Sequence, residues 1–247
     1  MNLSKRVLLP GILGLLLAFS LNTPAQWDKK PYGEWTEKES TKVLNDSPWA
    51  KTQVFTSANV AYNTGISGSS GVGSTRTGRP PDRPVDALHV NFRVRFLSAK
   101  PIRQAASRLI EIKKKGSGGE ELAEVLKNFA AGEFLEYIIV AVDVDSEDAG
   151  QNVQEAKSLL HRSGTANLKN NTYIEVKGGK KIFLQEFQTP KPDGLGARFI
   201  FPRLVDGKPF ITPESEEIHF FAELSGTYRL DRRYKTKDMM YEGKFEY

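Results

Sequence analysis

Two segments of the chain carry the hydrophobic patterns of β-strands. Between Leu88 and Phe96 apolar residues alternate with His, Asn and Arg, which is the period of a strand with one buried face. From Tyr137 to Val144 the residues are instead almost continuously Ile and Val, and this pattern predicts a central strand covered on both faces.

Amphipathic helices are predicted between these strands and shortly after them. Pro101 can open the first helix, in which apolar residues recur every three or four positions up to Leu109. The segments 122–129 and 152–162 repeat this spacing, and a glycine that can stop a helix follows each of them. We therefore expect a helical insertion around residues 98–163.

The rest of the chain has the pattern of short strands separated by turns. Gly178-Gly179 lies between two of them and predicts a tight hairpin. The expected strands are 173–177, 180–187, 197–201, 218–224, 227–235 and 241–247. Together the patterns predict an α+β fold, a mostly antiparallel β-sheet or sandwich with helices inserted around residues 98–163.

The N-terminal segment has the order of a secretory signal peptide. Lys5 and Arg6 precede an apolar run at 7–21, and small residues end it, so cleavage is expected between Ala25 and Gln26. A retained membrane anchor is the alternative, but as a helix this run would span about 22 Å of a hydrocarbon core of roughly 30 Å. We expect a periplasmic or extracellular (secreted) protein with no membrane span after cleavage.

The mature chain is expected to begin with a helical arm. Thr36 and Glu39 have the spacing of a capping box, Ser47-Pro48 offers a second helix start, and 53–62 has the pattern of a strand. The expected organisation is a signal peptide at 1–25, a Trp-rich helical arm with the first strand at 26–63, a flexible Gly/Ser/Arg/Pro loop at 64–84, and an α+β domain at 85–247.

Composition excludes several classes of function. The chain has 35 Lys and Arg against 30 Asp and Glu, and the leader removes two of the basic residues, so the charge argues against a nucleic-acid partner. Because Cys is absent, the chain has no disulfide scaffold, thiol nucleophile, cysteine metal site or cysteine lipid anchor. We expect no cofactor.

The densest acidic cluster follows the central strand. Asp143 and Asp145 are two residues apart, so in a strand their carboxylates share a face, as a site for a hard cation requires. The calcium-loop pattern fails, because Asp148 stands where glycine is needed and Gln154 where a bidentate Glu is needed. We therefore assign no metal ligand and favour a solvated strand end, in which Glu147 and Asp148 charge the next helix start.

Catalytic and contact residues are sparse. His89, His161 and His219 lie far apart, and no Gly-x-Ser-x-Gly motif occurs, so no catalytic residue is assigned. Trp35 and Trp49, if exposed, could stack on sugar rings or anchor a partner protein. The favoured alternative is that both are buried and clamp the N-terminal arm onto the sheet.

The basic strand at 229–237 is expected to be solvated, with binding of an acidic polysaccharide or lipid headgroup as the alternative. At the C-terminal end, charged residues alternate with Tyr241, Phe245 and Tyr247, so we expect this segment to belong to the fold.

Several segments carry a family resemblance: Lys30–Glu39 (KPYGEWTEKE), Asp46–Lys51 (DSPWAK), Ser98–Ala105 (SAKPIRQA), Phe201-Pro202 and Lys235–Lys244 (KTKDMMYEGK). In these the chain resembles a family of uncharacterised exported bacterial proteins, over most of its mature length. The sequence departs from the family pattern at Arg232-Arg233-Tyr234, where fewer charges are expected. The resemblance implies export and a shared fold, and it assigns no catalytic residue.

We therefore expect an exported, soluble, cofactor-free protein that binds or interacts with a protein or glycan partner in the cell envelope or outside it. The alternative is an envelope hydrolase with a spatially assembled acid or Ser/His site. An enzyme should show a pocket that gathers Asp143, Asp145, Glu147 or a histidine with shifted pKa values. A binding module should show a contiguous exposed aromatic or apolar patch.

Overall fold

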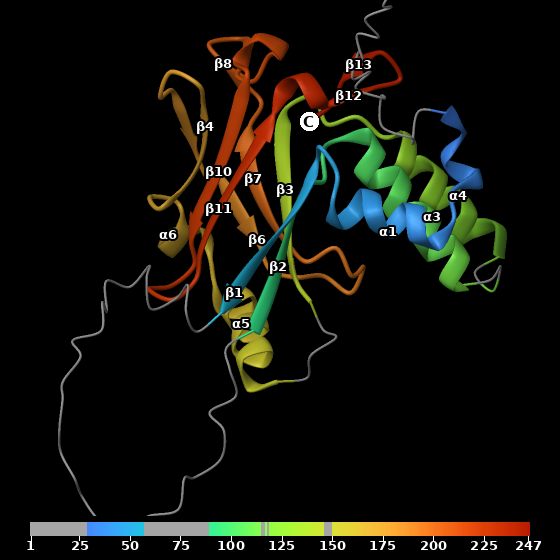
Figure 1. Ribbon diagram of the computed structural model, residues 1–247, viewed down its shortest axis with the longest axis horizontal. Helices are drawn as coiled ribbons and strands as arrows, with labels where there is room; N and C mark the ends of the chain where they lie inside the picture. Colours follow the sequence, from blue (N-terminus) through green and yellow to red (C-terminus); the bar gives the residue numbers. More distant parts are fainter. Residues whose placement is uncertain (1–28, 57–88, 115–116, 118, 146–149) are drawn as a thin grey trace, which may run out of the picture.

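The computed structural model describes residues 29–56, 89–114, 117, 119–145 and 150–247. The signal peptide expected at 1–25, its cleavage between Ala25 and Gln26, and the loop expected at 64–84 lie outside these residues. Two antiparallel sheets form a sandwich, and a group of helices packs beside one of them (Figure 1). The predicted α+β fold is confirmed.

The larger sheet has the strand order β1 (Ala50–Thr56), β2 (His89–Phe96), β3 (Tyr137–Val144), β7 (Ala197–Pro202) and β6 (Glu186–Gln188), all antiparallel. The alternating apolar residues of β2 are buried, as predicted. The central strand β3 is buried on both faces, because Val140 faces the second sheet while Ala141 lies on the side that the helices cover.

The smaller sheet has the order β11 (Arg229–Lys235), β10 (Glu217–Glu223), β4 (Thr172–Val176) and β5 (Lys181–Phe183). Aromatic rings fill the space between the sheets in edge-to-face contacts, such as Phe55 on Tyr228 and Phe96 on Tyr234. Burial raises the pKa of Tyr234, whose hydroxyl donates a 3.1 Å hydrogen bond to the main-chain oxygen of Val94 in the other sheet.

The two sheets are joined along both margins. At one margin the side chain of Gln53 in β1 donates to the main-chain oxygen of Arg229 (2.7 Å) and accepts from the N–H of Asp231 (2.8 Å). At the other margin the chain crosses from β5 to β6 between Leu184 and Gln185. The single strand predicted at 180–187 is therefore wrong, because this segment serves both sheets.

The helix predicted after Thr36 and the helices predicted within residues 98–163 are confirmed. The group beside the larger sheet contains the 3₁₀ turn η2 (Tyr32–Glu34), α1 (Glu37–Asn45), α3 (Lys100–Lys114) and α4 (Gly119–Ala131). Further along the chain, α5 (Gln151–Arg162) packs on β2 and β3, and α6 (Thr165–Leu168) on β6. The capping box of α1 is complete: Glu39 N–H donates to the Thr36 hydroxyl (3.2 Å), and Thr36 N–H to the Glu39 carboxylate (2.7 Å).

Two local predictions are wrong. Ser47-Pro48 begins no helix, because Ser47 pairs with Ala50 in a tight turn that leads into β1. The strand predicted at 241–247 is instead a small hairpin of β12 (Met240–Tyr241) and β13 (Lys244–Phe245), which we call the C-terminal hairpin. Its turn places Glu242 and Gly243 at φ 48° and 73°, in the left-handed region.

The remaining elements are β8 (Leu204–Val205), β9 (Lys208–Pro209), η3 (Pro213–Ser215) and η4 (Thr236–Asp238). None of the described helices combines the length and the hydrophobicity that crossing a membrane would require.

Candidate functional site

Trp35 and Trp49 are buried, and each is 1% exposed. The main-chain oxygen of Trp35 accepts a 2.9 Å hydrogen bond from Arg108 of α3, and the Trp49 ring packs edge-on against Tyr241 of the C-terminal hairpin. The alternative in which Trp35 and Trp49 are exposed and could contact a sugar or a partner protein is therefore wrong. The main-chain oxygen of Trp35 and the ring of Trp49 therefore tie the N-terminal arm to α3 and to the C-terminal hairpin.

The acidic residues at the end of β3 face arginines of β2. The strand register sets Arg93 opposite Asp143, and Arg93 Nη2 lies 2.6 Å from Asp145 Oδ2. Both Arg93 and Arg95 lie 3.9 Å from Asp143 Oδ2. Burial raises the pKa of Asp143, and the two arginines oppose this effect. Glu147 and Asp148 lie outside the described residues, within which no cluster of three or more His, Asp and Glu could hold a metal ion.

Arg95 is part of the packing of α1 on the larger sheet. Its Nε donates a 2.7 Å hydrogen bond to the main-chain oxygen of Leu44, and Nη2 lies 3.1 Å from Asn45 Oδ1. Burial lowers the pKa of Arg95 to about 10. Asp143 and Arg95 therefore link β3, β2 and α1, and neither lines the pocket beside the C-terminal hairpin or the one beside η3 and η4.

The three histidines do not meet. His89 lies at the start of β2, His161 near the end of α5, and His219 on the outer face of the smaller sheet. His219 Nε2 is 2.9 Å from Asp231 Oδ1, and Nδ1 is 3.6 Å from Glu175 Oε2. Both ring nitrogens thus face carboxylates, and no hydroxyl in the described part of the chain bonds to this ring.

The outer face of the smaller sheet has a row of aromatic side chains. Tyr173 stacks on Phe221 at 5.1 Å between ring centroids, and Lys181 Nζ lies 4.1 Å from the centroid of the Tyr173 ring. Tyr173 is therefore engaged by both neighbours, and Phe183 is the most exposed ring of the row, at 52%. These pairs stabilise the sheet across its strands.

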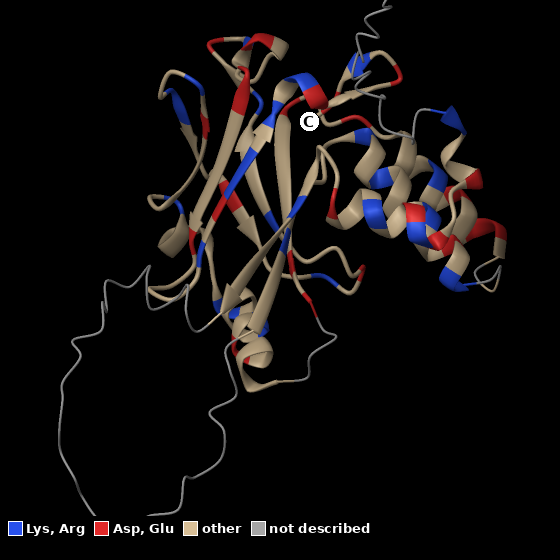
Figure 2. Ribbon diagram, viewed as in Figure 1, with Lys and Arg blue, Asp and Glu red and all other residues tan. Residues whose placement is uncertain are grey.

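Basic residues recur along β11 (Figure 2), and ion pairs with β10 hold two of its arginines. Arg229 lies 3.0 Å from Glu223, and Arg233 lies 2.6 Å from Glu217, both on β10. Arg232 is on the other face, where Nη1 contacts the main-chain oxygen of Thr52 at 3.5 Å and burial lowers its pKa. Because these arginines have neighbours of their own, β11 is a weak candidate for an anion-binding surface.

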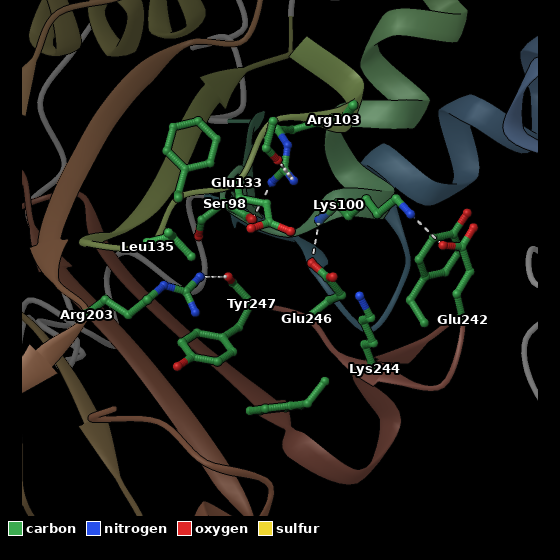
Figure 3. A pocket seen from close by; sticks show the side chains of 15 residues that line it. Ser98, Lys100, Arg103, Glu133, Leu135, Arg203, Glu242, Lys244, Glu246 and Tyr247 are labelled. Atoms are coloured by element: carbon green, nitrogen blue, oxygen red, sulfur yellow. Dashed lines mark hydrogen bonds and ion pairs between the residues drawn. The ribbon is translucent and has the colours of Figure 1, made fainter. Parts of the chain in front are cut away.

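A cavity of about 320 Å³ lies where the C-terminal hairpin meets the helices (Figure 3), and we call it the hairpin cavity. Its wall is built by the start of α3, the end of α4 with the following loop, Arg203 after β7, and the C-terminal hairpin. Its charged residues are Lys100, Arg103, Arg203, Lys244, Glu133, Glu242 and Glu246, and its large apolar and aromatic residues are Phe134, Leu135, Tyr241, Phe245 and Tyr247.

Arg103 forms the rigid base of the hairpin cavity. It is 2% exposed, and its guanidinium donates to the main-chain oxygens of Leu97, Ser98 and Gly132. These bonds connect the loop before α3 with the end of α4. Burial lowers the pKa of Arg103 to about 10, and the charge of Glu246 opposes that shift.

The C-terminal hairpin closes the cavity from the other side. Glu246 accepts a 2.9 Å hydrogen bond from the N–H of Lys100 at the start of α3, and the Lys100 ammonium pairs with Glu242. Arg203 donates a 2.6 Å hydrogen bond to the main-chain oxygen of Tyr247 and stacks 4.0 Å from the centre of that ring. The cavity wall is therefore fixed by interactions between segments that are far apart in the sequence.

No cluster of acids, histidines or nucleophiles in the sequence marks this cavity. The cavity residues come from four separate segments, and most of them are basic or aromatic. A signal was nevertheless present, since Ser98–Ala105 and Lys235–Lys244, two segments that carry the family resemblance, both contribute to the wall.

No family model, curated protein or solved structure matches this chain. The resemblance to exported bacterial proteins is therefore a prediction that rests on the segments quoted for it.

Proposed function

We propose that the protein is exported and acts by non-catalytic binding in the cell envelope or outside the cell, with the hairpin cavity as its binding site. The observation that carries this proposal is the composition of the cavity wall. Charged groups of both signs and several aromatic rings converge on a concavity of about 320 Å³. Ligand sites are concavities in which aromatic side chains and placed polar groups converge, and this cavity is a strongly charged example.

The rigidity of the wall supports a binding role. Arg103 is buried and bonded to three main-chain oxygens, and the bond from Lys100 to Glu246 ties the hairpin to α3. A wall that is already ordered loses little conformational entropy when a ligand enters, which favours affinity. The recognised group belongs either to a small molecule or to the end of a protein or glycan partner.

The proposal is tested by blocking the cavity. Ala131, at the end of α4, is exposed and lines the cavity, while Ala123 is exposed on the same helix and does not. We expect a ligand found by a thermal-shift screen of the full chain to raise the melting temperature of the wild type and of Ala123→Phe, and not of Ala131→Phe. If no compound in a broad metabolite and oligosaccharide panel distinguishes these variants, the cavity is not the binding site.

Export is tested on the natural product. Intact-mass analysis should find a chain that begins at Gln26, recovered from the periplasm or the medium. A product that retains Met1, or one that is recovered solely from the cytosol, contradicts export.

The alternative function is an envelope hydrolase, and one observation favours it. His219 and Asp231 lie 2.9 Å apart, which is the arrangement of a base with its orienting carboxylate. Screening the full chain against ester and amide substrates tests this alternative. Turnover that disappears in His219→Gln, with an unchanged melting temperature, would replace the binding proposal.

A further inference from the structure

We infer that the hairpin cavity takes a zwitterion, a free amino acid with an apolar or aromatic side chain. This inference rests on the proposed binding function and names the chemistry of the ligand. It is carried by acidic and basic groups that line the same cavity and leave atoms unbonded.

The acidic side consists of Glu133 and Glu246. The Glu133 side chain makes no hydrogen bond or ion pair with the described residues, and its carboxylate extends into the cavity (Figure 3). Glu246 uses Oε2 for the N–H of Lys100, and within the described chain its Oε1 carries no hydrogen bond. Both carboxylates line the same cavity, and both charges act on Arg103. An ammonium group has three donors and can contact both of them.

The basic side consists of Arg203 and Lys244. Arg203 bonds to main-chain oxygens through Nε and Nη2, and its Nη1 has no partner among the described residues. The Lys244 ammonium likewise makes no ion pair within the described chain. A ligand carboxylate can therefore accept from Nη1 of Arg203, and such charge-assisted hydrogen bonds are the stronger kind. Lys244 adds a second positive charge to the lining of the same cavity.

The apolar residues of the cavity would contact the side chain of the amino acid. Leu135 lines the cavity and is 70% exposed, and Phe134 and Phe245 also line the cavity and are partly buried. A side chain large enough to cover Leu135 would remove this apolar surface from water, which is favourable. The cavity is at the small end of ligand sites, as a single amino acid requires.

A ligand with one sign of charge fits less well. A simple anion would leave Glu133 and Glu246 facing it, and a simple cation would lie against Arg203 and Lys244. Like charges placed side by side in a binding site lower affinity. A zwitterion satisfies both groups at once, so the mixture of charges in the wall favours it.

Calorimetric titration of the full chain with L-phenylalanine tests the inference, with 3-phenylpropionate and phenethylamine as matched probes that each lack one charge. We expect L-phenylalanine to bind, and each single-charge probe to bind at least about tenfold more weakly, as expected for the loss of one charge-assisted contact. Glu133→Gln should weaken L-phenylalanine and phenethylamine, and it should bind 3-phenylpropionate at least as tightly as the wild type does, because a repelling charge is removed. Lys244→Gln should weaken L-phenylalanine and 3-phenylpropionate, and it should bind phenethylamine at least as tightly as the wild type does.

Both substituted side chains are exposed and make no hydrogen bond with the described residues, so the melting temperatures should not change. The inference is overturned if L-phenylalanine does not bind, or if either single-charge probe binds as tightly as the amino acid does. If another compound still raises the melting temperature of Ala123→Phe and not that of Ala131→Phe, the binding function stands and the zwitterion assignment alone is wrong.

Discussion

The indole Nε1 of Trp49 donates a 2.8 Å hydrogen bond to the main-chain oxygen of Glu246, 197 residues further along the chain. The bond joins the turn before β1 to the C-terminal hairpin, and the Trp49 ring packs at right angles to Tyr241 in the same contact. Glu246 also holds the start of α3, so one short segment connects the N-terminal arm, the helices and the hairpin cavity.

The contribution of this hydrogen bond to stability can be measured by comparison with the other buried tryptophan, Trp35. Trp35 is equally buried, but its Nε1 has no hydrogen-bond partner within the described chain. Trp49→Phe should therefore lower the free energy of unfolding by about 1–3 kcal/mol more than Trp35→Phe, because it leaves the oxygen of Glu246 without its donor. Urea unfolding of both variants gives the difference. Equal losses would mean that the bond contributes nothing beyond packing.

Removal of residues 240–247 should destabilise the fold strongly. Tyr241 and Tyr247 are 2% and 6% exposed, and the deletion also removes the partners of Trp49, Lys100 and Arg203. Loss of two buried aromatic side chains alone costs about 3–5 kcal/mol each. Calorimetry of the truncated chain tests this, and an unchanged melting temperature would show that the hairpin lies outside the cooperative unit.

Gly196 should tolerate no side chain. Its φ is 88°, and a Cβ at this position would lie 2.1 Å from the main-chain oxygen of Val142 in the neighbouring strand β3. Gly194 has φ 73° and no heavy atom within 4 Å of such a Cβ. Gly196→Ala should therefore cost about 3–5 kcal/mol by strain and overpacking, against about 1–2 kcal/mol for Gly194→Ala. Chemical denaturation measures both, and similar losses would mean that β7 can shift away from β3.

Acid should weaken the start of α1 through Glu39. Hydrogen bonds from Lys30 and Thr36 lower the pKa of Glu39 from 4.5 to about 2. Its ionised form therefore stabilises the folded chain above pH 4.5, and this contribution is lost as the pH falls towards 2.

The matching variant is Glu39→Gln, which keeps the capping hydrogen bonds and loses the charge. It should lower stability by about 0.5–1 kcal/mol at pH 7, and the difference from wild type should shrink below pH 4.5. Glu37→Gln, in the same helical turn but without the contact to Lys30, is the control. A difference that does not change with pH would contradict the assignment.

The regular elements could be predicted because their pattern is local. The alternation in β2, the continuous apolar run of β3 and the helical spacing of α3 each depend on neighbouring residues, and all three elements form where expected. The splitting of 180–187 between two sheets could not be predicted, because nothing in that segment indicates which strand each half will meet.

The hairpin cavity is built by contacts between segments that are far apart in the sequence, so no local pattern predicts it. Glu246 and Lys100 are 146 residues apart, and Arg203 reaches Tyr247 over 44. The sequence indicates that Trp35 and Trp49 matter, but a buried tryptophan and an exposed one have the same sequence pattern here. Only the packing of α3 and the C-terminal hairpin shows whether the two side chains are buried or exposed.

Gln53 has a consequence for the solubility of the chain. An unpaired strand margin offers N–H and C=O groups on which another molecule can build a further strand, and this is a common start of aggregation. The amide of Gln53 occupies two such groups on β11, the main-chain oxygen of Arg229 and the N–H of Asp231, and the edge strands β5 and β6 are each three residues long. Gln53 therefore ties one edge strand to the other sheet, so that a strand from another copy of the protein would have to displace this amide before it could pair with β11 at these groups.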